Sequence, residues 1–445
     1  MAMVVKNNLS AKNTLNQLNK NEKETAKSLK KVASGMKVNS AADDASGFAI
    51  SEKMRTQLRS LDQDVDNAQT GGSMLKVAEG GLQSTVDIIK TLKEKVINAA
   101  NDTNTDADRQ TIQKELDQAV DQIDDNANVM YNGKTMLDGS HNNSVIPGGT
   151  KTVLSNESFS QDVEIDMPFT DLTDFSGRSL GIHPDSRIEM SYVIKGKTYS
   201  MVLDPVKDHI LQDIFTASID PDTGNTSGAG NDMELLVDSV FDVDRTGAQI
   251  STINGGNAII FRAQNAGIEN QISGITFNVL DHDGTINRTA NSIFNNFTEV
   301  IRAEDESPDN ALTFQVGTKS NQTVKIGFSD MRSVALGLSA TDGSTLNIST
   351  RKNANAAISV LDLALQKTLD MQTTVGSLQS RLEYTESNLT VASENTQSSD
   401  SVIRDADMAK EMTAYTKNNV ITQAAQAMLS QANQNSSQVL SLLQG

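Results

Sequence analysis

Apolar residues recur on alternating three- and four-residue steps over two long stretches of this chain, which is the spacing of helices that pack against one another. The first stretch covers residues 44–99, and an unbroken helix of that length would be about 84 Å long. The second covers residues 351–400. Shorter stretches with the same spacing lie at 11–32, 106–130 and 421–442. The pattern predicts long, coiled-coil-like helices at both ends of the chain, packed as a rod.

The middle of the chain differs in composition from both ends. All six prolines, all four histidines and eleven of the twelve phenylalanines lie between residues 141 and 328. Residues 141–340 hold 13 Lys and Arg against 27 Asp and Glu, whereas residues 1–60 hold 11 against 5. These contrasts predict a mostly α chain whose helical arms flank an inserted, acidic, β-rich or α+β middle domain.

Two hairpins are expected from alternating apolar and polar residues on either side of a short turn. In residues 187–204 the turn is expected around Lys195-Gly196-Lys197, and in residues 312–328 around Ser320-Asn321. The remaining expected elements are strands at 257–265 and 274–281 and short helices at 211–219 and 290–301.

Composition and motifs exclude several classes of function. The formal net charge of −19 argues against a nucleic-acid binder, and no apolar run approaches the roughly 18 residues that a membrane helix needs. No cysteine is available for disulfides or thiolate chemistry. The chain has no nucleophile elbow, phosphate-binding loop, dinucleotide fingerprint or His-Glu-x-x-His motif, so we expect no catalytic residue, cofactor or metal. The N-terminus lacks a secretory apolar segment, which fits a cytosolic protein or one exported by a dedicated route.

The stretch "SGMKVNSAADDASGFAI" at residues 34–50 separates two helical patterns. Gly35 is placed to end the first helix in a left-handed conformation. Ser40 and Asp43 resemble a capping box that would start the second helix with Ser40 as its N-cap. Asp43 and Asp44 would then lie in its first turn, where the helix dipole favours negative charge. On spacing alone, this stretch is an ordinary connector between helices.

Four segments give the chain a resemblance to bacterial flagellins. "SGMKVNSAADDASGFAI" resembles their N-terminal signature, and "IRDADMAKEMTAYTKNNVITQAAQAMLSQANQNSSQVLSLLQG" resembles their C-terminal one. "MYNGKTMLDG" and "LTFQVGTKSNQTVKIGFSDMRSVALGL" are similar to the turn and the hairpin of their rod region. The resemblance covers roughly residues 1–140 and 310–445. It departs where many flagellins have a proline near the C-terminus and this chain has Asn435-Ser436-Ser437.

The resemblance implies a non-enzymatic, extracellular subunit of the bacterial flagellar filament, which assembles with copies of itself for motility. Its partners would be the flagellar export apparatus, an export chaperone, the filament cap and the hook-junction proteins. Gly35, Ser40, Asp43 and Asp44 would connect the filament core to the rod. The residues expected at the assembly interface are Leu15, Leu18, Leu29, Val32, Ile421, Ala425, Met428, Val439 and Leu442.

The same resemblance divides the chain into six segments. They are a filament-core helix and connector at 1–43, rod helices at 44–140, a variable surface-exposed domain at 141–310, a rod hairpin and loop at 311–350, a C-terminal rod helix at 351–400 and a C-terminal core helix at 401–445. Two alternatives stay open at this point: a hook–filament junction protein, and a flagellin-like carrier of an adhesive middle domain.

The resemblance also implies weak recognition by the mammalian Toll-like receptor that senses flagellin. Strongly recognised flagellins present an Arg, a Leu, a Gln and a Glu to this receptor. The equivalent positions here are Thr91, Lys95, Asn98 and Glu115, and Glu115 alone is retained.

Overall fold

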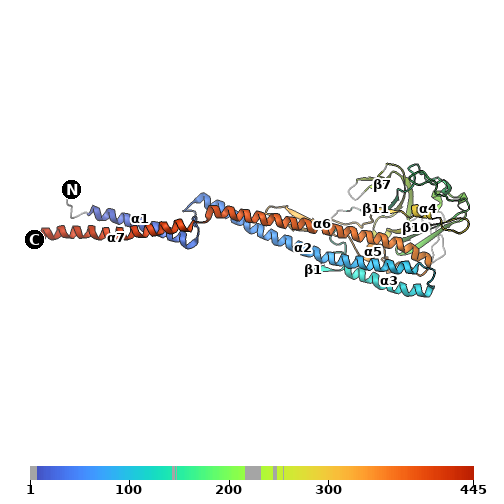
Figure 1. Cartoon of the computed structure of the whole chain (residues 1–445), viewed down its shortest axis with the longest axis horizontal. Helices are drawn as coiled ribbons and strands as arrows, with labels where there is room; N and C mark the ends of the chain where they lie inside the picture. The colour runs from blue at the N-terminus through green and yellow to red at the C-terminus, as the bar shows by residue number, and fades with distance from the viewer. Residues whose placement is uncertain are drawn as a thin grey trace. The chain divides into compact units, whose positions relative to one another are not determined.

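A computed structural model of the chain describes residues 8–142, 146, 148–215, 232–243, 248–253 and 255–444. The chain folds into two compact units. The first contains Met1–Ala68, Gln315–Gln322 and Tyr384–Gly445, and the second contains Gln69–Phe314 and Thr323–Glu383. Two helices, α2 (Ala45–Ala99) and α6 (Arg351–Arg404), begin in one unit and continue into the other (Figure 1).

The first unit is built on an antiparallel pair of terminal helices, α1 (Leu9–Ser34) and α7 (Met408–Gln444). The side chain of Asn8 caps α1 by accepting a 2.9 Å hydrogen bond from the backbone of Ala11. At the other end of α1, Gly35 adopts φ 69° and ψ 7°, the left-handed conformation expected of it. Polar contacts join the pair from end to end, between Asn8 and Ala432, Thr25 and Thr422, Ser28 and Asn418, and Lys31 and Glu411.

The long heptad patterns form the continuous helices α2 and α6, as predicted. Within the second unit their seam residues are fully buried, including Leu75, Leu82, Ile89, Leu361 and Val375. In α2, Gly71 also lies on the seam, and a Cβ there would stand 3.1 Å from a Leu382 methyl carbon and 3.3 Å from the Phe314 ring. The absence of a side chain therefore lets these elements approach closely.

A third helix, α3 (Asp106–Ala127), returns along α2 in the second unit. It begins with a reciprocal capping box, in which the Thr105 hydroxyl accepts from the backbone of Asp108 while the Asp108 carboxylate accepts from the backbone of Thr105. The two-residue strands β1 (Met130–Tyr131) and β2 (Lys134–Thr135) follow it. The segment 106–130 is thus helical as expected, but its last residues turn into a hairpin.

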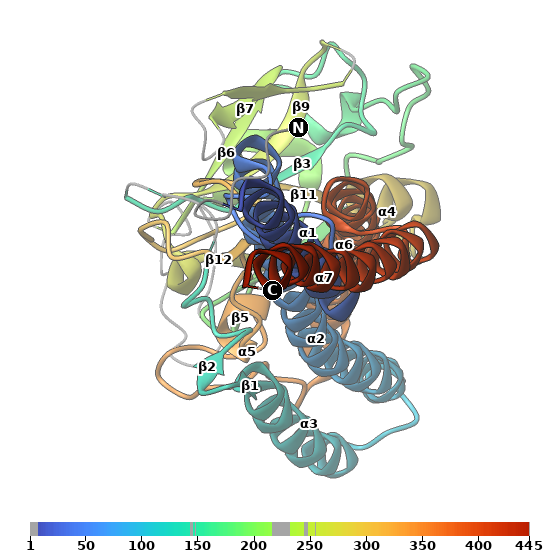
Figure 2. The same ribbon diagram turned by 90° about the vertical axis from the view of Figure 1, so that its left-hand side faces the viewer.

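The middle of the chain folds into two larger antiparallel sheets, with strand orders β10-β4-β5 and β11-β3-β9-β6. The strands of the second sheet, β11, β3, β9 and β6, are labelled in Figure 2. Apolar side chains of both sheets and of the segments packed on them form one core cluster, which includes Phe159, Phe169, Phe261, Phe277 and Phe294. The strands are β3 (Val153–Asn156), β4 (Arg187–Ile194), β5 (Lys197–Leu203), β6 (Met233–Asp238), β9 (Ala258–Ala263), β10 (Ile272–Leu280) and β11 (Thr298–Ile301).

Smaller elements complete the described residues. Two further pairs of strands are β7 (Val240–Val243) with β8 (Gln249–Ser251) and β12 (Leu312–Gln315) with β13 (Thr323–Ile326). The short helices are η1 (Phe169–Asp171), η2 (Val206–Asp208), η3 (Leu211–Phe215), η5 (Ile268–Asn270), α4 (Arg288–Phe294) and α5 (Ser333–Leu336).

Both predicted hairpins are present. Strands β4 and β5 pair from Ile188–Leu203 to Ile194–Lys197, and Lys195 and Gly196 both have positive φ in the turn between them. Asn321 has φ 66° in the turn between β12 and β13.

One element prediction was wrong. The segment 290–301 is not a single short helix, because α4 ends at Phe294 and residues 298–301 form strand β11. Residues Thr298–Ile301 pair with strand β3, and the local sequence does not reveal this long-range contact. In the segment 211–219, residues 211–215 form the 3-10 helix η3, and the rest lies outside the described residues.

Candidate assembly interface

The α1–α7 pair leaves many of its apolar side chains in solvent. Of the expected interface residues, Leu18 and Ala425 are buried between the helices and Val32 is half-buried. The others with described side chains are exposed: Leu15 (44%), Leu29 (50%), Ile421 (38%) and Met428 (62%). Val439 and Leu442 belong to α7, but their side chains lie outside the described residues. The structure therefore gives the pair an uncovered apolar surface.

Further exposed apolar residues lie on the same two helices and were not selected from the sequence. They occupy positions outside the heptad stripe, so spacing alone does not identify them. They are Leu9, Met408, Met412 and Val420.

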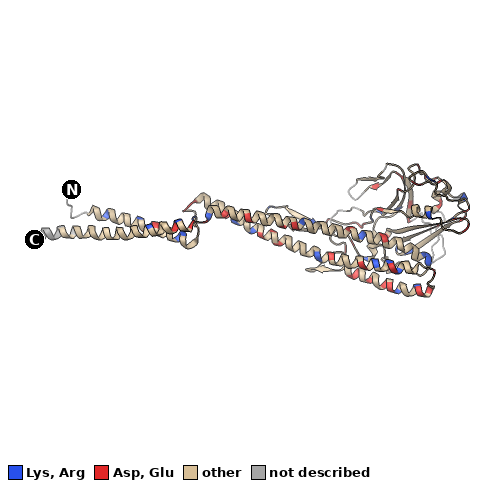
Figure 3. Ribbon diagram, in the orientation of Figure 1, with Lys and Arg blue, Asp and Glu red and all other residues tan. Residues whose placement is uncertain are grey.

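The C-terminal part of α7 contains no charged residue. Residues 418–445 contain no Asp, Glu, Lys or Arg, and this part of α7 carries no blue or red in Figure 3. An uncharged helix can be covered by a neighbour without desolvating an ion, which is the largest cost of burying polar surface. This end of α7 is therefore suited to burial against other chains.

The connector contains a correction to the expected cap. Ser40 is not the N-cap of α2, because residues 41–43 form a turn and the helix begins at Ala45. Asp44 caps α2 instead, since its carboxylate accepts a 3.0 Å hydrogen bond from the backbone of Gly47. Asp43 closes the preceding turn, and the Ser40 hydroxyl together with the backbone of Asn39 and Ser40 donates to its carboxylate. The hydrogen bond from the Ser40 hydroxyl is the main cause that lowers the pKa of Asp43.

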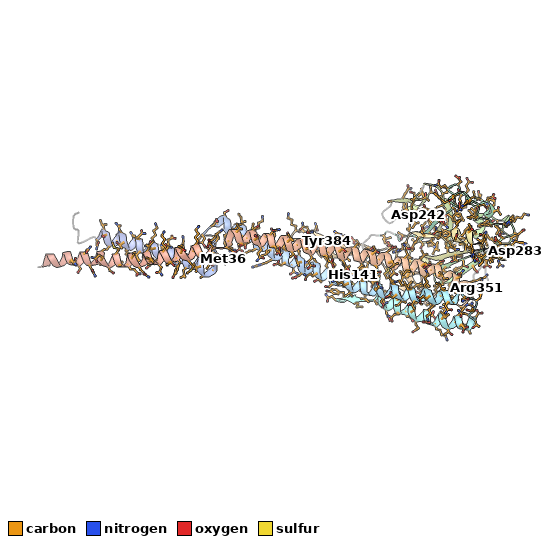
Figure 4. All side chains as sticks on the ribbon, viewed as in Figure 1. Met36, His141, Asp242, Asp283, Arg351 and Tyr384 are labelled. Atoms are coloured by element: carbon orange, nitrogen blue, oxygen red, sulfur yellow. The ribbon has the colours of Figure 1, made fainter. Side chains whose placement is uncertain are left out.

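The N-terminal connector is locked to the turn between α6 and α7 through Arg404. This guanidinium donates to Glu52 at 2.6 Å and to Ser51 at 3.2 Å, and it lies 5.4 Å from the centre of the Phe48 ring. The backbones are joined as well, since Lys37 donates to the carbonyl of Arg404 and Ala406 donates to that of Gly35. Met36, which bridges to Asp405, lies at this junction (Figure 4).

Arg404 and the nearby Asp400 were not among the residues selected from the sequence. Asp400 accepts hydrogen bonds from Ser51 and Arg55, so it ties α6 to the start of α2. Both residues stand where the heptad pattern of the C-terminal arm breaks, in "SSDSVIRDADM". The available signal was the presence of an Arg and an Asp at the point where this apolar pattern ends.

Replacing Arg404 with alanine is expected to loosen this junction. The substitution removes a nearly buried cation together with its bonds to Glu52 and Ser51, so we expect trypsin to cut at Lys37 about tenfold faster, as a loss of about 1.4 kcal/mol predicts. Arg404→Lys should restore little, because an ammonium cannot span the same partners. Equal cleavage rates in the parent chain and Arg404→Ala would contradict the assigned role.

The expected receptor positions come together on neighbouring faces of α2 and α3. Lys95 forms a 3.0 Å ion pair with Glu115, the single retained position. The Thr91 hydroxyl donates to the carbonyl of Asp87 at 2.9 Å, and the backbone and side-chain oxygens of Asn98 accept from Asn104. Each of these side chains therefore has an internal partner.

No metal-binding cluster is present in the described parts of the chain. Residues 8–142, 146, 148–215, 232–243, 248–253 and 255–444 contain no cluster of three His, Asp or Glu side chains that could hold a metal ion. Across the same ranges, no helix is long and apolar enough to cross a membrane.

Comparison with known proteins places these features in a family. The profile of the bacterial flagellin N-terminal helical region matches residues 5–142, and that of the C-terminal helical region matches residues 358–443. A flagellin of Clostridium tyrobutyricum is 31% identical over 433 residues, which cover 97% of this chain and 99% of that protein. The chain belongs to the bacterial flagellin family. A flagellin of Bacillus subtilis strain 168 is 28% identical over 444 residues, covering 99% of this chain and 100% of the relative.

As a flagellin, the chain is a structural, non-enzymatic subunit of the extracellular flagellar filament. Solved structures that align with it include the flagellar junction protein FlgL from Legionella pneumophila, at 15% identity and TM-score 0.31 over 80% of this chain and 99% of that one. Another is FliC from Burkholderia pseudomallei, at 19% identity and TM-score 0.26 over 70% and 99%. TM-scores this low do not relate the shapes of the chains, whereas the full-length relatives named above are flagellins.

Proposed function

We propose that this flagellin polymerises by covering the exposed apolar faces of α1 and α7 with the same helices of neighbouring copies. The observation that carries the proposal is the large exposure of Leu29 and Met428 on a pair that buries few of its own apolar side chains. Complete burial of one such side chain stabilises association by about 1.5–3 kcal/mol. Repeated over several residues and every subunit, this contribution offsets the entropy of ordering the arms.

Membership of the flagellin family suggests further partners, which would bind the same terminal helices before and after assembly. We propose the flagellar export apparatus and an export chaperone for the unassembled chain, and the filament cap and hook-junction proteins for the filament ends. Support comes from the uncharged, apolar end of α7, which needs a cover while it is still outside the filament.

For the middle segment 141–310, we propose a solvent-exposed domain that polymerisation does not require. Its two ends lie next to each other: a His141 ring nitrogen is 3.2 Å from the carbonyl of Asn310, and Ile146 bridges to Ser307. Adjacent ends allow a domain to be removed without stretching the chain that remains. Its excess of acidic residues would also limit lateral association between filaments.

Joining residue 140 to residue 310 through a short Gly/Ser linker should therefore preserve filament formation. We expect a lower melting temperature, because α6 contributes Leu363 to the middle core and Ser359 bonds to Thr276. Lys367, which is buried against Glu299 and Gln271, loses these partners but becomes accessible to water. Electron microscopy after salt-induced polymerisation provides the measurement. A truncated protein that is folded and exported but forms no filaments would contradict the assignment.

Weak activation of the flagellin-sensing Toll-like receptor is the second expected property. Glu115 already forms an ion pair with Lys95 within the chain. Lys95 also places a hydrated charge where the receptor would meet an apolar side chain. We expect the double variant Thr91→Arg, Lys95→Leu to be at least about tenfold more potent in a receptor reporter assay, since hot-spot contacts contribute about 2 kcal/mol or more.

The matched control makes the same chemical changes on α3, as Thr111→Arg with Lys114→Leu, at two exposed positions. It should leave the potency unchanged. Weak recognition would be refuted if the parent chain were as potent as a flagellin that carries Arg and Leu at these sites. It would also be refuted if the double variant were no more potent than the parent chain.

A further inference from the structure

One ionisable residue stands in the seam of α2. From Leu61 to Ala99, every position on the alternating three- and four-residue spacing is buried. All are apolar except Asp64, Gly71 and Thr85. Gly71 is explained by the close approach of Leu382 and Phe314, and the Thr85 hydroxyl donates to the carbonyl of Gly81. Asp64 has no comparable explanation.

The Asp64 side chain is buried with one of its carboxylate oxygens unpaired. The residue is 4% exposed, and its Oδ2 atom has no hydrogen-bond partner among the described residues. A hydrogen bond from Ser393 to Asp62 places this turn of α2 beside the α6 turn that carries Leu389 and Ala392. An ionised carboxylate at such a position loses its hydration and gains nothing in return.

No charged neighbour in the described part of the chain relieves this cost. The ionisable residues on the neighbouring turns are Arg59, Asp62 and Asp66 on α2, Glu386 and Glu394 on α6, and Lys319 in the β12–β13 turn. Burial is the one cause that shifts the pKa of Asp64, and it raises that pKa above its ordinary value of 3.8. Neither Lys319 nor the four acidic residues contribute to the shift.

We propose that Asp64 is a proton-sensitive weak point of the α2–α6 helix pair, which loosens around residues 61–68 when this carboxyl group is ionised and tightens when it is protonated. The device resembles the polar core residues of coiled coils, which lower stability at one chosen layer while the apolar layers on either side hold.

The direction of the pH dependence follows from proton linkage. Because burial raises the pKa, the folded pair binds the Asp64 proton more tightly than the unfolded chain does. The contribution of this residue to stability therefore falls as pH rises above its ordinary pKa, and its destabilising effect is fully present once the pH exceeds the raised pKa of the folded state. Removing the charge should thus stabilise this section at pH 7.5.

Amide hydrogen exchange of the full-length monomer at pH 7.5 tests the proposal. Asp64→Asn should slow exchange in residues 61–68 by a factor of about 3 to 10, because a neutral amide costs less to bury than an unpaired carboxylate oxygen. Asp64→Leu, which restores an apolar seam, should slow it further. Asp62→Asn is the matched control, since it removes the same charge from an exposed position two residues away, while the amide oxygen can still accept the hydrogen bond from Ser393. It should change exchange less than twofold.

A carbon NMR titration of aspartate-labelled protein supplies the second readout. The Asp64 carboxyl should titrate above its ordinary pKa of 3.8. An Asp64 midpoint at or below 3.8 would overturn the proposal. So would unchanged exchange in Asp64→Asn, or an equal gain in Asp62→Asn, which would trace the effect to the net charge of the chain.

Discussion

Replacing Met428 with aspartate should abolish filament growth. Among the expected interface residues whose side chains are described, Met428 is the most exposed, and it lies in the part of α7 that has no charged side chain. In the proposed contact a neighbouring copy covers this position, so each added subunit would bury an unpaired carboxylate. The penalty for such burial is several kcal/mol per ion, which exceeds what one apolar side chain contributes to association.

Pelleting of salt-induced polymer by ultracentrifugation measures the effect. Ile286→Asp is the matched control, because Ile286 is also about as exposed, at 60%, but lies in the middle domain. That variant should pellet like the parent chain, and both variants should match the parent in helical content as monomers. Normal pelleting of Met428→Asp would remove α7 from the proposed interface.

The terminal helices should resist proteolysis in the filament but not in the isolated monomer. Among the described residues of α1 and α7, the apolar side chains that the pair buries are Leu18 and Ala425. Ordering the backbone costs about 1–2 kcal/mol per residue, and so little burial cannot offset that cost. The missing surface would come from neighbouring copies, which couples folding of the arms to assembly.

Trypsin provides suitable cleavage sites for this comparison. Lys20 and Lys27 in α1 and Lys417 in α7 should be cut at least about a hundredfold faster in the monomer, as a stabilisation of about 2.7 kcal/mol or more on assembly implies. Lys76, within the packed part of α2, serves as the internal reference and should be protected in both states. Equal protection of the arms in monomer and filament would show that α1 and α7 fold without neighbours.

The helical arms could be predicted from sequence because their packing repeats. A spacing of three and four residues specifies which face of a helix is covered, and the structure buries that face in α2 and α6. The hairpin at Lys195-Gly196 could also be predicted, because its turn residues and its alternating apolar and polar residues lie within one short segment. The order β11-β3-β9-β6 could not be predicted, because β3 pairs with β9 and β11, which both lie more than a hundred residues further along the chain.

The interface was only partly predictable for a related reason. A heptad stripe identifies Leu18 and Leu29 as apolar positions alike, but only the partner helix decides that Leu18 is buried while Leu29 is exposed. The start of α2 was misplaced because Ser40 and Asp44 are both good capping residues, and local spacing does not choose between them. Arg404 was missed because its partners Glu52 and Phe48 lie in the other arm.

Electron microscopy of the purified chain after salt-induced polymerisation tests most directly whether the chain assembles through its terminal helices. The full-length protein should form long helical filaments with itself alone, and a version truncated before Met408, which lacks α7, should remain unassembled under the same conditions. Filaments formed by the truncated chain, or no filaments from the full-length chain, would contradict assembly through the terminal helices.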